Sequence, residues 1–170
     1  MFTESLQTLD TRAEAAMEVE LQTLIDKDRI AEVVHRLFIA TDTRDWEGVR
    51  ACFADEVLFD MTSVAGGEPA RATPRQITDG WEEGLRQVQA IHHQAGNLLV
   101  SPRGGEADAF CYGTATHYLP TPSGRDTRVF VGSYDFHLVR RDGRWQIDRF
   151  RFDLKFLDGN PNLEAEAAAG

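Results

Sequence analysis

Two adjacent histidines, His92 and His93, stand in the stretch IHHQAGNLLV, which otherwise has the composition of a buried strand. Successive side chains of a strand point to opposite faces of a sheet, so the two imidazoles cannot face the same space. An inward-facing histidine beside a carboxylate is suited to general base catalysis, because the carboxylate orients the ring and stabilises its protonated form. Which histidine faces inward, and which carboxylate meets it, decides whether this chemistry is possible.

Asp42 is the carboxylate that the pattern places best for such a histidine. It continues an apolar stripe that runs at helical spacing through residues 30–38, so its side chain should point toward the sheet. Burying an unpaired charge is costly, and we therefore expect Asp42 to have a partner. Asp45 has a simpler explanation, because it stands just before Trp46 where the N-cap of a short helix belongs.

His117 is the other histidine that could do chemistry. It lies near the end of a predicted strand, on the face formed by the small residues Ala109, Cys111, Gly113 and Ala115. A face of small residues leaves room either for a closely packed helix or for a cavity. A structural role also stays open for each member of the set, because a lone strand histidine is commonly a hydrogen-bonded core residue and a helix-terminal aspartate is commonly a cap.

Three predicted helices precede the four long strands of the C-terminal half. Asp26 is suited to cap the first helix, whose apolar positions are Ile30, Val33, Val34, Leu37 and Phe38. The second follows Asp45, and the third opens at Thr73-Pro74 with proline in its first turn. The segment EVLFDM predicts a first strand, and VAGGEPARATP has the composition of a loop.

From His92 onward the hydrophobic period changes to two, which is typical of strands. We expect four long strands over His92–Ser101, Glu106–Leu119, Thr127–Arg141 and Arg144–Asp158. Their connections, PRGG, PTPSGRD and RDGR, are turn compositions suited to antiparallel hairpins. Helices followed by a meander of strands predict an α+β fold, with the helices on one face of a curved antiparallel sheet. We divide the chain into a helical extension (1–22), one domain (23–158) and a disordered tail (159–170).

Composition restricts the class of partner. The chain has 170 residues and a formal net charge of −10, which argues against binding to nucleic acid or to an anionic membrane surface. The two cysteines are isolated, and no Cys/His ligand spacing appears, so we expect no metal. No apolar run has the length of a signal peptide or reaches the ~18 residues of a membrane span. We therefore expect a cytoplasmic protein.

Four short motifs occur in one order along the chain: D-x-x-D-W at residues 42–46, FADEVLFD at 53–60, H-x-x-x-N at 93–97 and RRDGRWQI at 140–147. Together they resemble the nuclear transport factor 2-like superfamily, and within it the SnoaL-like and scytalone dehydratase-like branch. The resemblance covers roughly residues 22–158. It implies a cone: a strongly curved, mainly antiparallel sheet, closed by three helices of the N-terminal half and enclosing a pocket.

The resemblance also implies roles for residues. Asp42 takes the position of the aspartate and His93 that of the histidine in the catalytic dyad of this branch, and His117 matches its second histidine more loosely. Scytalone dehydratases carry a tyrosine where this chain has Thr41. Some members carry a basic residue on the last strand; Arg149 and Arg151 are candidates, but strand parity can instead place them outside and leave Phe150 and Phe152 to line the pocket.

We expect from these features a small cofactor-independent lyase or isomerase of the dehydratase kind. His93, assisted by Asp42, would abstract a proton from a hydrophobic cyclic or aromatic small molecule. The candidate substrate-contacting residues are Trp81, Asn97, Cys111, Phe130, Tyr134 and Phe150. The alternative is a ligand-binding or assembly module of the same fold without catalysis. Apolar residues on both faces of strand 127–141 further predict a homodimer or homotrimer.

Overall fold

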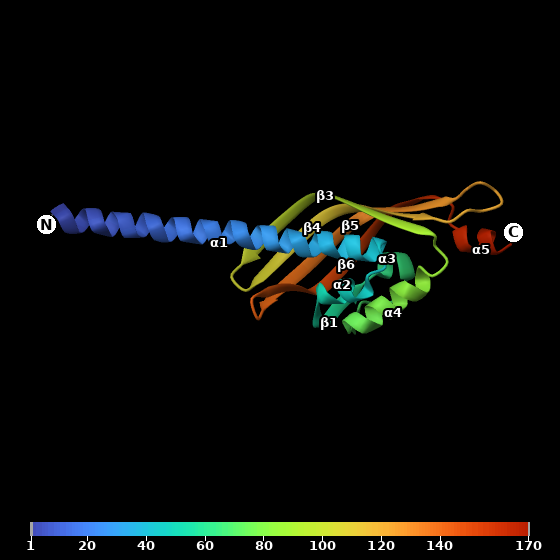
Figure 1. Cartoon of the computed structure of the whole chain (residues 1–170), viewed down its shortest axis with the longest axis horizontal. Helices are drawn as coiled ribbons and strands as arrows, with labels where there is room; N and C mark the ends of the chain where they lie inside the picture. The colour runs from blue at the N-terminus through green and yellow to red at the C-terminus, as the bar shows by residue number, and fades with distance from the viewer. Residues whose placement is uncertain (1, 170) are drawn as a thin grey trace.

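The computed structural model describes the backbone of residues 2–169 and the side chains of residues 12–169. One six-stranded, curved sheet runs through the molecule in the order β2-β1-β6-β5-β4-β3, and helices cover one of its faces (Figure 1). The strands are β1 (Phe53–Asp60), β2 (Ala70–Ala72), β3 (Ala90–Arg103), β4 (Glu106–Tyr118), β5 (Thr127–Arg141) and β6 (Arg144–Gly159). The helices are α1 (Phe2–Asp42), α2 (Trp46–Ala51), α3 (Thr62–Ala65), α4 (Pro74–Gly84) and α5 (Leu163–Ala168).

The strands from β3 to β6 form an antiparallel meander, while β1 pairs with β6 in parallel and with β2 in antiparallel orientation. The predicted α+β class and the predominance of antiparallel pairing are therefore confirmed. The β5–β6 turn follows its sequence signal closely. Asp142 and Gly143 both have positive φ, 50° and 75°, which is the conformation that an Asp-Gly pair favours in a two-residue hairpin.

Helix α1 continues through Asp26, so the prediction that this residue caps a helix is wrong. Residues 2–42 contain neither glycine nor proline, and nothing in that run stops a helix. The Asp26 carboxylate is buried and accepts hydrogen bonds from Arg140 Nη1 (3.2 Å) and Trp145 Nε1 (3.3 Å). Asp26 therefore fastens α1 to the β5–β6 hairpin, and the part of α1 before it projects from the body of the molecule (Figure 1).

Helices α2 and α4 begin where their caps predict. Asp45 accepts a hydrogen bond from the Gly48 backbone N–H (2.9 Å) at the start of α2. Thr73 and Gln76 form a reciprocal capping box at the start of α4, with Pro74 in the first turn. None of the described helices is long and apolar enough to cross a membrane.

A bulge in β3 changes which face its side chains occupy. The register with β4 shifts between Gly96 and Leu99, and Asn97 takes a positive φ of 56°. Before the bulge the odd-numbered residues face the helices; after it Leu98 and Val100 pack against the core. Asn97, a candidate substrate-contacting residue, therefore does not share the inner face with His93, and its side chain is exposed.

The C-terminal segment also differs from expectation. Residues 163–168 form α5 rather than a disordered tail, and Leu163 and Asn160 are fully buried. The Asn160 side chain donates to the Arg125 carbonyl (3.0 Å), and its backbone N–H donates to the Thr127 carbonyl (2.7 Å). These anchors hold the segment on the end of β5, where its composition of alanine and glutamate gave no strong signal.

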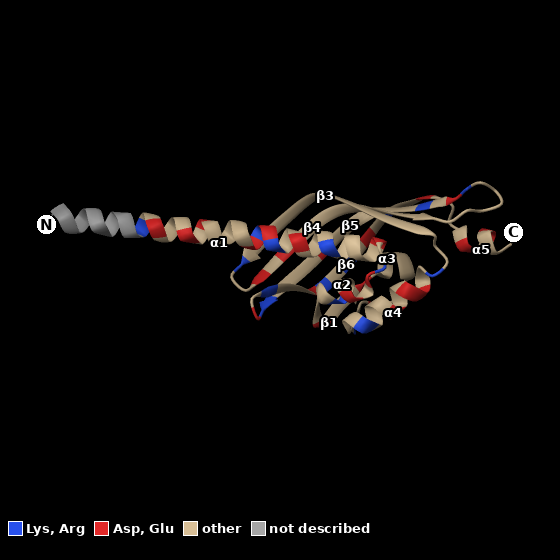
Figure 2. Ribbon diagram, viewed as in Figure 1, with Lys and Arg blue, Asp and Glu red and all other residues tan. Residues whose placement is uncertain are grey.

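Charged side chains gather on the helices and at the hairpin ends, whereas the middle of β3, β4 and β5 carries few of them (Figure 2). The main hydrophobic core lies between α1, α2 and the inner face of the sheet. Cys111 is fully buried within it, and burial raises the pKa of its thiol to about 12.

Candidate active site

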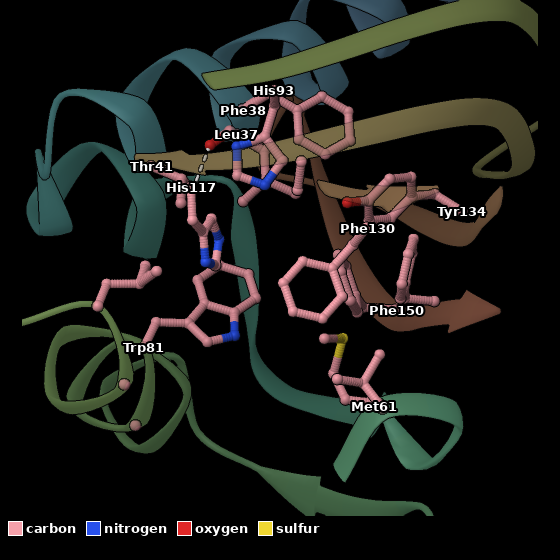
Figure 3. A pocket seen from close by; sticks show the side chains of 16 residues that line it. Leu37, Phe38, Thr41, Met61, Trp81, His93, His117, Phe130, Tyr134 and Phe150 are labelled. Atoms are coloured by element: carbon pink, nitrogen blue, oxygen red, sulfur yellow. Dashed lines mark hydrogen bonds between the residues drawn. The ribbon is translucent and has the colours of Figure 1, made fainter. Parts of the chain in front are cut away.

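A cavity of about 220 Å³ lies between the helices and the inner face of the sheet. Helices α1, α3 and α4 form one wall, and strands β3, β4, β5 and β6 form the other. Most of the lining is apolar or aromatic, and its polar side chains are Thr41, Trp81, His93, His117 and Tyr134. In Figure 3 the rings of the two histidines and of Trp81 and Phe130 border the same space.

Asp42 and His93 make the contact that their positions predict. His93 Nδ1 lies 2.6 Å from Asp42 Oδ1, and the His93 backbone N–H donates to both carboxylate oxygens, at 3.1 and 2.9 Å. Since a carboxylate accepts hydrogen bonds, Nδ1 is the donor and Nε2 is the ring nitrogen left for the cavity. The side chains are 13% and 19% exposed respectively for His93 and Asp42, so the pair is shielded from bulk water without being sealed.

The ends of two elements produce this pair. Asp42 is the last residue of α1. His93 is the fourth residue of β3, at the position opposite Ala115 of β4. Phe38, one turn before Asp42, stacks on the His93 ring with centroids 5.3 Å apart and planes 21° apart. The imidazole is therefore held between a carboxylate and an aromatic face, which restricts its rotation.

His92 points the other way, as strand alternation predicts. Its side chain is 76% exposed, and its Nδ1 lies 3.8 Å from Asp42 Oδ2. The distance is beyond hydrogen-bond range, so His92 is at most a weak electrostatic neighbour of the carboxylate.

His117 borders the same cavity from β4, but its partner is a cation. Arg128, its cross-strand neighbour on β5, places Nη2 3.1 Å from His117 Nδ1. Burial, followed by the positive charge of Arg128, lowers the pKa of His117 to about 4. His117 is therefore neutral near pH 7.

Tyr134 brings its phenol to the cavity because a glycine makes room for its ring. A Cβ at Gly113 of β4 would lie 2.4 Å from the Tyr134 ring, so no larger residue fits opposite it. Burial raises the pKa of Tyr134, and the hydroxyl therefore keeps its proton and can donate. Part of the small-residue face of β4 thus accommodates an aromatic ring rather than a helix.

Four of the six predicted substrate-contacting residues border the cavity: Trp81, Phe130, Tyr134 and Phe150. The other two do not, because the bulge turns Asn97 outward and Cys111 lies deeper in the core. Arg149 and Arg151 are both 53% exposed and lie beside Asp108 and Asp153 on the other face. Phe150 and Phe152 accordingly face the cavity from β6.

Other lining residues carry weaker sequence signals. Met61 and Val64 come from the short helix α3, which lies in a stretch that predicts strand end and loop. Gly80 and Gly84 line the cavity from α4, one turn apart, and both are exposed, so they lie at its mouth. Helical spacing from the buried Ile77, at i+3 and i+7, places both glycines on the face toward the cavity, but glycine has no side chain that would mark it as a lining residue.

Within residues 12–169, no group of three or more His, Cys, Asp or Glu side chains is arranged to hold a metal ion.

The chain is similar in sequence to one protein family and in structure to several solved proteins. Residues 22–151 match the family model of the SnoaL-like domain. The Kfla4162 protein from Kribbella flavida superposes with a TM-score of 0.77 at 21% identity, over 80% of this chain and 95% of that one. No curated protein is matched by the chain.

Two further solved structures share the fold. A protein from Novosphingobium aromaticivorans, described as a candidate scytalone dehydratase, has a TM-score of 0.71 at 16% identity, over 81% of this chain and 89% of that one. The hexachlorocyclohexane dehydrochlorinase LinA-type3 from Novosphingobium barchaimii has a TM-score of 0.70 at 14% identity, over 84% of this chain and 94% of that one. At such low identity these similarities establish the fold alone.

Proposed function

Because the chain belongs to the SnoaL-like family of the nuclear transport factor 2-like superfamily, we propose that it is a cofactor-independent lyase or isomerase that acts on a small hydrophobic molecule. The observation that carries the proposal is the Asp42–His93 pair at the wall of an apolar cavity. His93 Nε2 takes a proton from a carbon next to a carbonyl or a leaving group. Asp42 holds the ring in the required tautomer and stabilises the imidazolium that forms.

The cavity sets limits on the substrate. An apolar cavity of about 150 Å³ already binds benzene, whereas sites for larger ligands reach ~300–1,000 Å³. A volume of about 220 Å³ therefore suits a molecule of one substituted ring or two small fused rings. The aromatic wall formed by Trp81, Phe130 and Phe150 favours a cyclic or aromatic compound.

The names of two proteins with this fold support the reaction class. One is described as a candidate scytalone dehydratase and another as a hexachlorocyclohexane dehydrochlorinase. Loss of water and loss of hydrogen chloride are both eliminations that begin with removal of a proton from carbon. A buried histidine base with a carboxylate partner supplies that step in the present chain without a further group.

The proposal is tested with purified protein and a panel of cyclic hydroxyketones, hydroxylated aromatics and chlorinated rings, with product detected by mass. For an accepted compound, His93→Ala should lower kcat by ~10²–10⁴-fold, because the base is removed. Asp42→Asn should lower kcat less, since the base remains but its orienting charge is lost. His92→Ala changes the exposed neighbour and serves as the matched control, with kcat unchanged.

Two results would contradict the proposal. If His93→Ala retains full turnover, His93 is not the base. If compounds bind with affinity that depends on the cavity residues and yet none is converted, the protein is a binding module of this fold. Circular dichroism of each variant separates a loss of catalysis from a loss of folding.

A further inference from the structure

Arg128 links His117 to the C-terminal helix through a chain of hydrogen bonds. Its Nη1 and Nη2 donate to the two oxygens of Glu164 on α5, at 2.8 and 2.6 Å. The same Nη2 lies 3.1 Å from His117 Nδ1. The Arg128 side chain is 13% exposed, and its guanidinium carbon lies 5.2 Å from the centre of the Phe130 ring. The ion pair with Glu164 and the contact with the Phe130 ring therefore restrict the position of the guanidinium beside His117.

The chemistry of the guanidinium decides the tautomer of His117. Arginine has donors and no acceptor, so His117 Nδ1 must accept the hydrogen bond. A neutral imidazole with an accepting Nδ1 carries its proton on Nε2. This arrangement is the reverse of that at His93, where a carboxylate requires Nδ1 to donate and leaves Nε2 with a lone pair.

The surroundings keep His117 neutral. Burial and the charges of Arg128, His93 and Arg44 lower its pKa, and Glu164 opposes them, with a result of about 4. His117 is thus not a second base at neutral pH, because its Nε2 is already protonated and its Nδ1 is occupied. It offers the cavity one N–H donor. The Tyr134 hydroxyl, which remains protonated because it is buried, offers a second donor from the next strand.

We propose that His117 Nε2–H is the hydrogen-bond donor to a substrate oxygen in this cavity, and that Arg128, held by Glu164 of α5, is the residue that positions His117 for this role. The inference rests on the proposed function and narrows its substrate class to compact apolar ketones with an acidic C–H beside the carbonyl. As His93 takes that proton, the C–H electron pair moves onto the carbonyl oxygen to form an enolate. The His117 donor stabilises the enolate oxygen.

The enolate collapses without any further reactant. In an isomerase the proton returns from His93 to another carbon of the conjugated system. In a lyase a hydroxyl on the β-carbon leaves as the carbonyl re-forms, and the His93 proton departs with it as water. A chlorinated hydrocarbon has no oxygen acceptor and would leave the His117 N–H unpaired in an apolar cavity, which is costly. The His117 donor therefore favours an oxygenated substrate over a halogenated one.

The tautomer is measured directly by ¹⁵N NMR of the imidazole in the full chain, without any ligand. We expect His117 to show a protonated Nε2 and an unprotonated, hydrogen-bonded Nδ1 between about pH 5 and pH 8. A proton on Nδ1, or titration of His117 near its ordinary value of 6.5, would overturn the inference. This readout does not depend on turnover.

The role of Arg128 is tested with matched substitutions. Arg128→Gln removes the positive charge and introduces a group that can also accept, so the pKa of His117 should rise and the Nδ1–H form should appear. Arg128→Lys can still only donate, and should retain the Nε2–H form. Arg125→Gln is the control, because Arg125 also binds the C-terminal segment, at the Gly159 carbonyl (2.9 Å), but belongs to the β4–β5 loop. An unchanged His117 spectrum in Arg128→Gln would refute the positioning role.

The contribution of α5 is tested on two glutamates of the same helix. Glu164→Ala releases Arg128 and should shift the His117 Nδ1 resonance, whereas Glu166→Ala, which breaks a contact with Ser123 (2.7 Å), should not. For an accepted ketone, Glu164→Ala should lower kcat more than it changes KM. If NMR gives the expected tautomer and no ketone is converted, the proposed catalysis fails and the donor assignment stands.

Discussion

The Nδ1 atoms of His93 and His117 meet opposite partners across one cavity. A carboxylate faces the first at 2.6 Å and a guanidinium faces the second at 3.1 Å. One histidine therefore presents a lone pair to the cavity, and the other presents a proton. Strand alternation and the D-x-x-D-W motif predict the first pairing from sequence. Nothing local predicts the second, because the role of His117 depends on Arg128 in the adjacent strand and on Glu164 in the tail.

The depressed pKa of His117 has a consequence for stability. Its folded value of about 4 lies below the ordinary 6.5, so the unfolded chain binds more protons between these two values. The contribution of His117 to the free energy of unfolding is fully present above about pH 6.5 and is lost as the pH drops toward 4. At 1.36 kcal/mol per pKa unit, this histidine alone should cost about 2 kcal/mol in free energy of unfolding between about pH 7 and about pH 5.

Urea unfolding of the wild type and of His117→Phe at these two pH values measures the contribution of His117 to the pH dependence of stability. The variant should lose less stability on acidification than the wild type, because it has no group to protonate at that site. Carboxylates remote from this site titrate equally in both proteins and cancel in the difference; Glu164, which shares Arg128 with His117, does not. His92→Phe removes an exposed histidine and should retain the wild-type slope. Equal slopes for wild type and His117→Phe would show that His117 titrates normally in the folded protein.

The hairpins and capped helices are the elements that local sequence predicts well. The Asp-Gly turn at residues 142–143 and the start of α4 at Thr73-Pro74 depend on a few neighbouring residues, and both form as expected. The bulge at Asn97 and the helix α5 were not predicted, because each depends on tertiary contacts. A bulge reverses strand parity beyond it, so an alternation argument remains valid for His93 and fails four residues later.

A glycine inside helix α4 lowers the stability of the helix and leaves space at the cavity mouth. Gly80 stands inside the helix, where glycine costs ~0.5–1 kcal/mol relative to alanine. A Cβ there would meet no atom within 4 Å, so the fold does not require glycine at this position. Gly80→Ala should raise the free energy of unfolding by about 0.5–1 kcal/mol and weaken binding of the bulkiest accepted compound, since its methyl group enters the cavity.

Chemical denaturation and isothermal titration measure the two effects of Gly80→Ala separately. Glu82→Ala, on an exposed position of the same helix, should leave ligand binding unchanged and serves as the control. If Gly80→Ala stabilises the protein and binds all compounds as the wild type does, the mouth of the cavity does not limit substrate size.

The cavity is a property of the whole chain. Asp42 and His93 are 51 positions apart in the sequence, and Arg128 and Glu164 are 36 positions apart. Parity within β5 correctly assigns Phe130 and Tyr134 to the inner face. In β6 a register shift beside Asp148 reverses the alternation after Ile147, so that Phe150 faces inward. The volume of the cavity was not predictable, because it depends on where α3 and α4 stop over the open end of the sheet.

The outer face of the sheet carries a second apolar surface. We define the outer patch as Leu99, Phe110, Tyr112, Val131 and Phe156, which lie on four neighbouring strands. Leu99, Tyr112 and Phe156 are 66%, 44% and 55% exposed. Figure 2 shows few charges on the middle of β3 and β4, whereas β6 carries Arg149, Arg151, Asp153 and Lys155. Lys155 Nζ lies 4.6 Å from the centre of the Tyr112 ring, so a cation adjoins these apolar side chains. Exposed apolar side chains gathered on one face of the sheet are the physical basis for expecting a homodimer or homotrimer.

Light scattering coupled to size-exclusion chromatography tests this expectation at micromolar protein. Leu99→Asp combined with Phe156→Asp should convert the oligomer to monomer, because two charges cannot be buried in an apolar contact without partners. The projecting part of α1 exposes Met17 and Leu24, at 65% and 63%, and supplies the competing interface. Met17→Asp combined with Leu24→Asp is therefore the matched control and should leave the oligomer intact. Dissociation by this second pair alone would place the contact on α1, and a monomeric wild type would remove the oligomer altogether.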